Sequence, residues 1–523
     1  MAFSTRHLLG WNDRVLDIIR ELVIANESES DATIVILAEK DKVEMDDIIA
    51  TGIEELKTTR VITRRGSGAT LSNLRRVAAK EAKSAILLSR AKESDNEEER
   101  RSADARVLKT ILALISCQGG HNSMSIVVDI HYQSNRELLK TFEDPLITAI
   151  DNWDILAKIL VQTSRTTGLA MVYDEILSFR GCELYFYKAN WKNLPFCELA
   201  FHFQDGVPIG VRKAAGTLIL KPGQESVMEP EDEVLLIAED DSSIHFAESP
   251  VVRPEELPFT LQRREKQVER ELILGWHIMT KNIIREYTDY LMEGSTVDIM
   301  VPNPSEELIR EIVELQEENT TLTINPIDLN PMSITQLKQV DPFSYDNIIV
   351  LSQTTRGASA ERVDSETLFI LLLLRKVHKE LERPGESQTT IITQVLNSEN
   401  QELITQTEVD DFLISNKIVT MIYAQLSEEA GMRQVYEDIF AEEGSEIYVK
   451  PVTLYFPQLP VKARFADLIA LACKRDEICI GIRLGEHAHH PDKNFGITLN
   501  PAKDAVFTLD DDDSLVVLAE DEL

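Results

Sequence analysis

The sequence has few cysteines and no long apolar run. The cysteines are Cys117, Cys182, Cys197, Cys473 and Cys479. Their number is odd and no C-x-x-C pair occurs, so neither a disulfide framework nor a zinc ribbon is indicated, and a reducing compartment is favoured. The longest strongly apolar stretch, 368–374, is far shorter than the roughly 18 residues of a membrane-spanning helix. With 43% hydrophobic and 27% charged residues, we expect a soluble, globular chain.

Positive charge is also scarce. The chain has 54 Lys and Arg against 89 Asp and Glu, a formal net charge of −35. Nucleic-acid binding needs a basic face that neutralises phosphates, so this balance argues against a general nucleic-acid partner. Cations are more natural ligands, although a surface kept from aggregating by like charge explains the acidity equally well.

The sequence contains a long internal repeat. HLLGWNDRVLDIIREL begins at His7, and LILGWHIMTKNIIREY begins at Leu272. Further matches keep a constant spacing of 263 residues, as the pairs Leu74 and Leu337 or Tyr185 and Tyr448 illustrate. A duplication of this length predicts two copies of one domain, an arrangement that usually binds and transmits shape.

Each copy predicts an α/β fold with a smaller β-rich part. In copy one, apolar runs at 6–10, 33–38, 60–63, 84–89 and 125–130 alternate with helical patterns, which predicts a mostly parallel, Rossmann-like sheet with helices on both faces. Helices are expected at about 153–164 and 171–177, followed by a β-rich subdomain. The predicted domains are a Rossmann-like lobe over 1–150, a helical crossover over 151–180, a β-rich lobe over 181–246, a linker or short connecting helix over 247–270, a second Rossmann-like lobe with the start of its crossover over 271–424, and the remaining crossover helix and β-rich lobe over 425–523.

The turn after the first strand is the natural place to look for a nucleotide, because a helix N-terminus follows it. The G-x-G-x-x-G fingerprint would need glycine at 10, 12 and 15, where the chain has Gly10, Asn12 and Val15. Copy two departs further, with Gly275, His277 and Thr280. Candidate nucleotide-binding residues remain in copy one, since Asn tolerates a left-handed backbone and an acid ends the second strand. They are Gly10, Asn12, Asp13 and Glu39.

The interpretation we prefer for this turn is a scaffold that keeps only the glycine its backbone needs, so tight binding of NAD or another nucleotide is not expected. A nucleotide-dependent oxidoreductase would suit the fold. However, the chain has no C-x-x-C, G-x-S-x-G or H-E-x-x-H motif, and we predict that it is not an enzyme.

The motifs of copy one resemble a known family. GWNDRVLDIIREL, VILAEKD, RRGSG, AILLS, SADARVLK and the closing LLIAEDD resemble the cytosolic part of the CASTOR/POLLUX ion channels, in which tandem RCK domains (regulators of K⁺ conductance) follow a membrane pore. The resemblance covers essentially the whole chain and is stronger in copy one. It implies a homotetrameric gating ring of eight RCK domains on the cytosolic side of a membrane, a pore domain as partner and Ca²⁺ as a candidate ligand. No pore helices precede Arg6, so we expect that this chain alone does not conduct.

The resemblance also suggests residues for a cation. In calcium-gated RCK domains an acid follows the fourth strand and carboxylates end the fifth. On this sequence these positions are Asp104, Asp129 and His131 in copy one, and Asp364 and Gln394 in copy two. His131 is a poor substitute, because hard cations prefer several oxygen ligands. The alternative is that Asp104 and Asp364 cap the helix that follows each of them.

Two further features are open to interpretation. Glu486, His487, His489, His490 and Asp492 could hold a transition metal, although a solvated loop is the more ordinary explanation. The segment 368–374 and its counterpart 105–115 are strongly apolar, which predicts burial in a core or a ring interface.

The alternative function is a free-standing RCK subunit of a Trk/Ktr-type K⁺ transporter that binds a nucleotide. Such subunits normally keep an intact glycine fingerprint, which is missing here.

Overall fold

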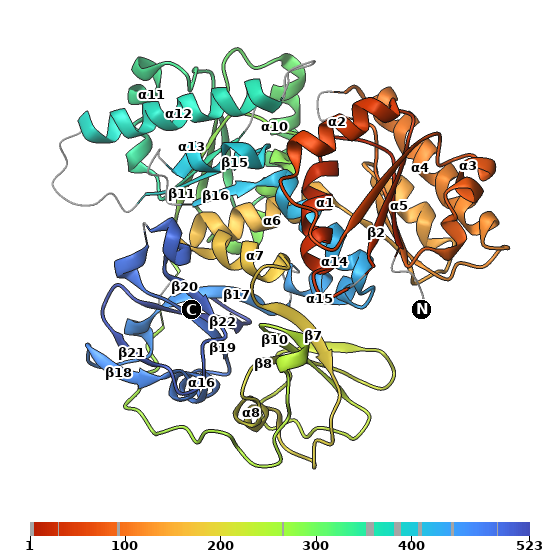
Figure 1. Ribbon diagram of the computed structural model, residues 1–523. Coiled ribbons are helices and arrows are strands. Elements are labelled where there is room, and N and C mark those ends of the chain that lie inside the picture. The colour runs from red at the N-terminus through yellow and green to blue at the C-terminus, as the bar shows by residue number, and fades with distance from the viewer. Residues whose placement is uncertain are drawn as a thin grey trace.

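The computed structural model describes residues 5–29, 31–91, 95–263, 266–351, 360–380, 389–405, 411–440, 444–488 and 490–522. Two Rossmann-like lobes lie side by side, and two β-rich lobes lie together beneath them (Figure 1). The helices that connect the lobes occupy the centre of the molecule. The predicted α/β architecture, two tandem units that each have a Rossmann-like sheet and a smaller β-rich lobe, is therefore confirmed.

The first lobe is a six-stranded parallel sheet in the order β3-β2-β1-β4-β5-β6. Its strands are β1 (Thr5–Leu9), β2 (Thr33–Ala38), β3 (Arg60–Arg65), β4 (Ser84–Leu87), β5 (Ser125–Asp129) and β6 (Ile147–Ile150). Its helices are α1 (Val15–Ala25), α2 (Lys42–Gly52), α3 (Leu71–Arg76), α4 (Glu97–Cys117) and α5 (Gln133–Lys140). The five strands expected from Val- and Ile-rich runs are confirmed to within two residues at either end. The sixth strand, β6, was not predicted.

The second lobe repeats this topology in the order β13-β12-β11-β14-β15-β16, again all parallel. Its strands are β11 (Arg270–Leu274), β12 (Thr296–Met300), β13 (Thr323–Ile327), β14 (Asn347–Val350), β15 (Thr390–Val395) and β16 (Asp411–Ile414). Its helices are α9 (Thr280–Tyr290), α10 (Glu306–Glu318), α11 (Ile334–Val340), α12 (Ala360–Glu380) and α13 (Gln401–Thr405). The duplication seen in the sequence is thus a duplication of the sheet.

The two copies exchange their crossover helices. These are α6 (Asn152–Arg165) with α7 (Leu169–Leu177) in copy one, and α14 (Ser415–Glu428) with α15 (Met432–Ile439) in copy two. Helix α6 packs on α9, β14 and β15 of the second sheet, whereas α14 packs on α1, β4 and β5 of the first. In Figure 1, α14 accordingly lies beside α1 and α6 beside β15 and β16. Each lobe is completed by a helix of the other copy.

The β-rich lobes are antiparallel. Copy one has the sheet β7-β10-β8-β9, formed by β7 (Glu183–Tyr187), β8 (Val207–Arg212), β9 (Leu218–Leu220) and β10 (Glu233–Ala238), with α8 (Phe196–Leu199) beside it. Copy two has the sheet β17-β22-β19-β20 and the pair β18-β21, formed by β17 (Glu446–Pro451), β18 (Val461–Arg464), β19 (Ile478–Arg483), β20 (Ile497–Leu499), β21 (Val506–Leu509) and β22 (Ser514–Ala519), with α16 (Phe465–Cys473). The described part of the linker after Ala247 forms no helix; it runs along these lobes, where Thr260 N donates to Tyr455 O at 2.8 Å.

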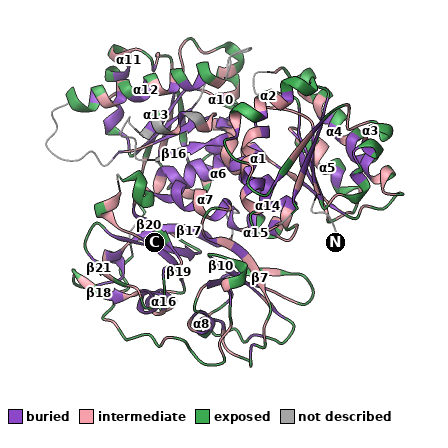
Figure 2. Cartoon of the chain, in the orientation of Figure 1, coloured by how far each residue is buried: buried purple, intermediate pink, exposed green. Residues whose placement is uncertain are grey.

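Burial follows the same plan. The sheets and the central helices α6 and α7 are largely buried, whereas α2, α10 and α12 keep one exposed face (Figure 2). Acidic turns at 229–233 and 510–513 precede β10 and β22. They are only partly exposed, because Asp232 and Asp513 are buried and accept backbone N–H groups of their own turns. Among the described residues, no helix is long and apolar enough to cross a membrane.

Candidate functional site

Asp129 is the centre of a buried polar cluster at the carboxyl end of β5. Its Oδ2 accepts from Arg14 Nη1 at 3.1 Å and from Ser89 N at 3.3 Å. Its Oδ1 accepts from Asn152 Nδ2 at 3.0 Å and from the Tyr423 hydroxyl at 3.1 Å. Tyr423 lies on α14, so this cluster joins copy two to the sheet of copy one. We call Arg14, Asp129, Asn152 and Tyr423 the Asp129 hub.

Asp104 holds the loop that follows β5. It accepts from the backbone N–H groups of His131 and Tyr132, both at 3.1 Å, and from Asn135 Nδ2 at 2.8 Å. The His131 ring contacts Ser89 Oγ at 3.0 Å. Asp104, which lies on α4, therefore fixes the start of α5.

Copy two repeats this device. Asp364 accepts from Leu396 N, Asn397 N and Asn400 Nδ2 at 2.8–3.0 Å, and burial raises the pKa of its carboxyl above the ordinary value. The alternative that Asp104 and Asp364 cap their own helices is wrong, since both lie inside a helix and Asn96 is the N-cap of α4. Each aspartate instead accepts hydrogen bonds from the loop that follows the fifth strand of its own sheet.

The residues predicted for a cation do not form a coordination shell in this arrangement. The oxygens of Asp104 and Asp129 already accept hydrogen bonds from the donors named above, and the Arg14 guanidinium supplies the positive charge beside Asp129. In copy two, Gln394 donates through Nε2 to Ser415 Oγ at 2.9 Å. Among the described residues, no three His, Cys, Asp or Glu side chains gather in a way that could hold a metal ion. A hard cation needs several free oxygens, so these side chains do not fit one as they stand.

The nucleotide corner is tightly closed. Gly10 has a φ of +119°, and a Cβ there would lie 2.5 Å from Leu88 O, which explains why glycine is needed. Asn12 turns inward, donating to Ser89 O at 3.1 Å and accepting from Arg14 N, while Asp13 is exposed. The cavity over these strand ends measures about 30 Å³, far less than the several hundred Å³ typical of ligand pockets.

Glu39, the expected ribose acceptor, is engaged by two arginines. Arg90 and Arg106 both pair with its Oε2, the latter at 2.9 Å. Burial opposes ionisation, but hydrogen bonds from Arg90 and Ser67 outweigh it and lower the pKa of the Glu39 carboxyl. A ribose would have to compete with these ion pairs.

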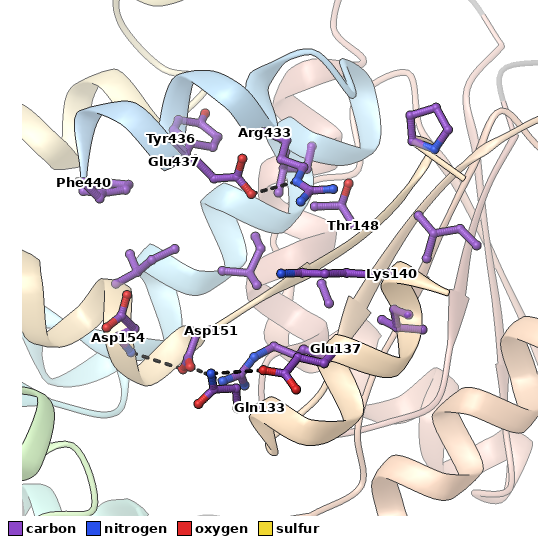
Figure 3. A pocket seen from close by; sticks show the side chains of 18 of the residues that line it. Gln133, Glu137, Lys140, Thr148, Asp151, Asp154, Arg433, Tyr436, Glu437 and Phe440 are labelled. Carbon is purple, nitrogen blue, oxygen red and sulfur yellow. Dashed lines mark hydrogen bonds and ion pairs between the residues drawn. The ribbon is translucent and has the colours of Figure 1, made fainter. Parts of the chain in front are cut away.

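A large cavity opens between the two copies (Figure 3). It has a volume of about 600 Å³ and is bounded by α5, β6 and the start of α6 from copy one and by α14 and α15 from copy two. We call it the inter-copy pocket. Sequence reasoning missed it because its walls come from segments almost 300 residues apart. Its labelled lining residues in Figure 3 are Gln133, Glu137, Lys140, Thr148, Asp151, Asp154, Arg433, Tyr436, Glu437 and Phe440.

The inter-copy pocket has a charged wall over an apolar base. Three of its acids are paired: Asp151 with Arg136, Asp154 with Lys158 at 3.2 Å, and Glu437 with Arg433 at 2.8 Å. Burial raises the pKa of Asp151. Thr148 Oγ1 is buried in β6 and has no hydrogen-bond partner among the described residues, so a ligand that presents a polar atom there would satisfy it.

The equivalent place in copy two is nearly filled. It lies between α7, β16 and α14, and its described walls leave about 10 Å³. There Lys417 Nζ pairs with Asp174 at 2.5 Å, at positions equivalent to Asp154 and Glu437. Residues 406–410 lie outside the described part of the chain. Copy one thus carries the roomier of the two pockets.

The histidine cluster near the C-terminus shows ordinary surface contacts. His487 Nε2 lies 3.2 Å from Glu486 Oε1 and 3.1 Å from Lys493 Nζ, and His490 Nδ1 lies 3.9 Å from Asp492. His489 lies outside the described residues. A lysine ammonium against the imidazole is a poor neighbour for a metal ion, which agrees with the lack of a three-ligand group among described side chains.

Residues 153–252 match the family described as Castor and Pollux, part of voltage-gated ion channel, and residues 9–128 match the slowpoke-like RCK domain of calcium-activated potassium channels. The chain is 30% identical, over 91% of its length, to the probable ion channel CASTOR of Oryza sativa subsp. japonica, of which it covers 56%. It is 29% identical, over 91% of its length, to ion channel CASTOR of Lotus japonicus, of which it covers 58%. The chain therefore spans little more than half the length of these relatives.

Among solved structures, the human SLO3 gating ring matches 99% of this chain and 99% of its own, with a TM-score of 0.65 and 14% sequence identity. At this identity the likeness shows that the two chains share a fold.

Proposed function

Because the chain belongs to the CASTOR and POLLUX family of ion channels, we propose that it is the cytosolic regulatory ring of a cation channel of that type. Four chains would form a ring of eight RCK domains beneath a membrane pore. The ring would bind a ligand, Ca²⁺ or another cation, and pass a change of shape to the pore. The observation that best supports this role is the exchange of α6 and α14, which makes the packing of each lobe depend on the other copy.

A ligand between the copies would act directly on this packing. The inter-copy pocket and the Asp129 hub both combine residues of the first sheet with residues of α14 or α15. A ligand can shift a two-state element only by binding one state better, and a site shared by two moving parts meets that requirement. A differential affinity of a few kcal/mol is enough to move such an equilibrium.

The Ca²⁺ proposal can be tested by freeing Asp129 from its built-in cation. We expect the unaltered chain to bind Ca²⁺ weakly and Arg14→Met to bind it about tenfold more tightly, because the competing guanidinium is gone. Isothermal titration calorimetry with CaCl₂ measures both, after circular dichroism has shown that the variant is folded. Arg14→Met with Asp129→Asn is the control and should lose the gain. Equal affinities of Arg14→Met and the unaltered chain would show that Asp129 takes no part in Ca²⁺ binding.

The ring can be tested at the helices α4 and α12, whose outer faces carry apolar side chains. Leu112 is 53% exposed on α4, and Phe369 and Leu372 are 45% and 51% exposed on α12. Exposed apolar side chains in one stretch are typical of an interface. We expect light scattering to give four chain masses for the unaltered protein, and fewer for Phe369→Glu with Leu372→Glu, because two charges would be buried in the contact.

The matched control for the ring is Val43→Glu on α2, since Val43 is 65% exposed but lies on another helix. It should leave the assembly intact. A tetramer that survives the α12 substitutions would move the proposed interface elsewhere, and a chain that stays monomeric at high concentration would count against a ring stable without its pore.

The alternative function is a separate RCK subunit of a Trk/Ktr-type K⁺ transporter that binds a nucleotide. The same calorimeter distinguishes it when NAD or ATP replaces CaCl₂. The small cavity at Gly10 and the ion pairs of Glu39 lead us to expect no tight NAD binding. A submicromolar NAD affinity would favour the alternative.

A further inference from the structure

The starts of the two central strands carry a cation in one copy and an acid in the other, at the same position. Arg6 on β1 pairs in register with Ser84 on β4, and Glu271 on β11 pairs in the same register with Asn347 on β14. Arg6 is 1% exposed and Glu271 is fully buried. The duplication has therefore placed a cation in one copy where the other has an acid.

The last residues of the two exchanged helices also carry opposite charges, and each is complementary to the sheet that the helix covers. Helices α6 and α14 both have 14 residues, and their last residues are Arg165 and Glu428. Because each helix packs on the other copy's sheet, Glu428 meets Arg6, while Arg165 meets Glu269, the residue before β11, and also Glu522. The cation of the first sheet is thus matched by an acid on α14, and the acid beside the second sheet is matched by a cation on α6.

The contacts at both ends are close and mostly buried. Glu428 binds Arg6 through both carboxylate oxygens, with Oε2 at 2.7 Å from Nη2, and Lys83 adds a second cation at 2.6 Å. Arg165 is 8% exposed and forms a two-point pair with Glu269, at 2.8 and 3.1 Å. Two-point pairs of this kind fix geometry as well as charge.

Residues in the middle of α6 and α14 also distinguish the two sheets, independently of the charges at the helix ends. Tyr423 on α14 donates to Asp129, whereas the equivalent residue of α6 is Leu160, which is fully buried. On the second sheet, Gln394 and Met279 replace Asp129 and Arg14. If α6 covered the first sheet, Asp129 would lose a donor; if α14 covered the second, the Tyr423 hydroxyl would be buried without its acid. Both errors are costly, because an unmatched buried polar group loses its hydration.

We infer that these residues make the two copies an obligate unlike pair: each sheet accepts the crossover helix of the other copy and rejects the helix of its own kind. Pairing of two first copies would set Arg165 against Arg6, and pairing of two second copies would set Glu428 against Glu269. Like charges held together at a buried contact are strongly unfavourable, which is how specific interfaces exclude wrong partners. This pairing rule is independent of what the chain regulates.

The test exchanges the two helix ends without changing composition or net charge. In Arg165→Glu with Glu428→Arg, each helix carries the wrong charge for the sheet on which it lies. We expect Tm to fall by about 10 °C, and the amides of α6 and α14 to exchange with solvent about 100-fold faster. Adding Arg6→Glu and Glu269→Arg reverses the main partner at each end, while Lys83 and Glu522 keep their charges. This fourfold variant should recover at least half of both losses.

A neutral variant separates discrimination from the simple loss of an ion pair. Arg165→Met with Glu428→Gln removes the attraction without adding repulsion, so it should lose clearly less than the charge exchange. If the exchanged chain does not fold at all, folding of the fourfold variant still supports the inference. An exchanged chain no less stable than the neutral variant, or a fourfold variant that recovers nothing, would overturn it.

Discussion

Replacing Asp129 with alanine should lower the free energy of unfolding by about 3–5 kcal/mol, the usual cost of removing one partner from a buried ion pair. The Arg14 guanidinium would lose its carboxylate partner, and Asn152 and Tyr423 would lose an acceptor inside the protein. Burial already raises the pKa of the Tyr423 hydroxyl well above its ordinary value, so this group cannot ionise to compensate. Urea unfolding followed by tyrosine and tryptophan fluorescence measures the change.

Copy two provides a matched control for this substitution. Gln394 occupies the position of Asp129 but bonds as a neutral amide to Ser415, so Gln394→Ala should cost only about 1–2 kcal/mol. Arg14→Met should cost less than Asp129→Ala, because the carboxylate keeps three other donors. If Asp129→Ala and Gln394→Ala lost the same stability, the Asp129 hub would contribute no more to stability than the neutral contact at the equivalent position of copy two.

The repeated sheet could be predicted from the sequence because its signal is local. Strand β2 was predicted with the bounds observed, Thr33–Ala38, since a run of Val and Ile bounded by polar residues has few alternatives once both faces are covered. The constant spacing of 263 residues extended the same prediction to copy two, where individual strands such as β13 are less apolar. Repetition therefore supplied information that single strands lacked.

The errors came where a local pattern was ambiguous or a strand was short. The sixth strand, β6, has only four residues, and its role depends on pairing with β5. Asp104 was a plausible helix cap, but the true start is Asn96, whose side chain accepts from Glu99 N while Glu99 reaches back to Asn96 N. That Asn-x-x-Glu pattern stands in the sequence and would have given the correct start.

The contacts of the candidate sites could not be predicted in the same way. Asp129 was chosen from a family resemblance, yet three of its partners lie at positions 14, 152 and 423, and the last belongs to the other copy. Nothing in the periodicity of either copy says that the crossover helices exchange sheets. The exchange becomes clear only when the ion pairs of Arg6 with Glu428 and of Arg165 with Glu269 are seen.

Stability should fall as the pH rises from 5 to 9, and Glu271→Gln should remove a large part of that fall. Burial raises the pKa of the Glu271 carboxyl to about 8, although hydrogen bonds from Asn347 and Tyr287 work in the other direction. The folded state therefore keeps a proton that the unfolded chain releases near its ordinary pKa of 4.5. Because the folded state binds more protons over this interval, the stabilisation is fully present below pH 4.5 and is lost as the pH passes 8.

The difference in the free energy of unfolding between the parent and Glu271→Gln reports on this one carboxyl group. A glutamine resembles the protonated acid at every pH, so the variant should match the parent within about 1 kcal/mol near pH 5 and exceed it by about 3–4 kcal/mol at pH 9. Glu286 and Glu183 also have raised pKa values, to about 8 and about 7, but they contribute the same slope to both proteins. Urea unfolding at four pH values, with the exposed Glu307→Gln as control, gives the comparison. Parallel curves for the parent and Glu271→Gln would mean that Glu271 is ionised in the folded state, with Arg165 as the cation that keeps it so.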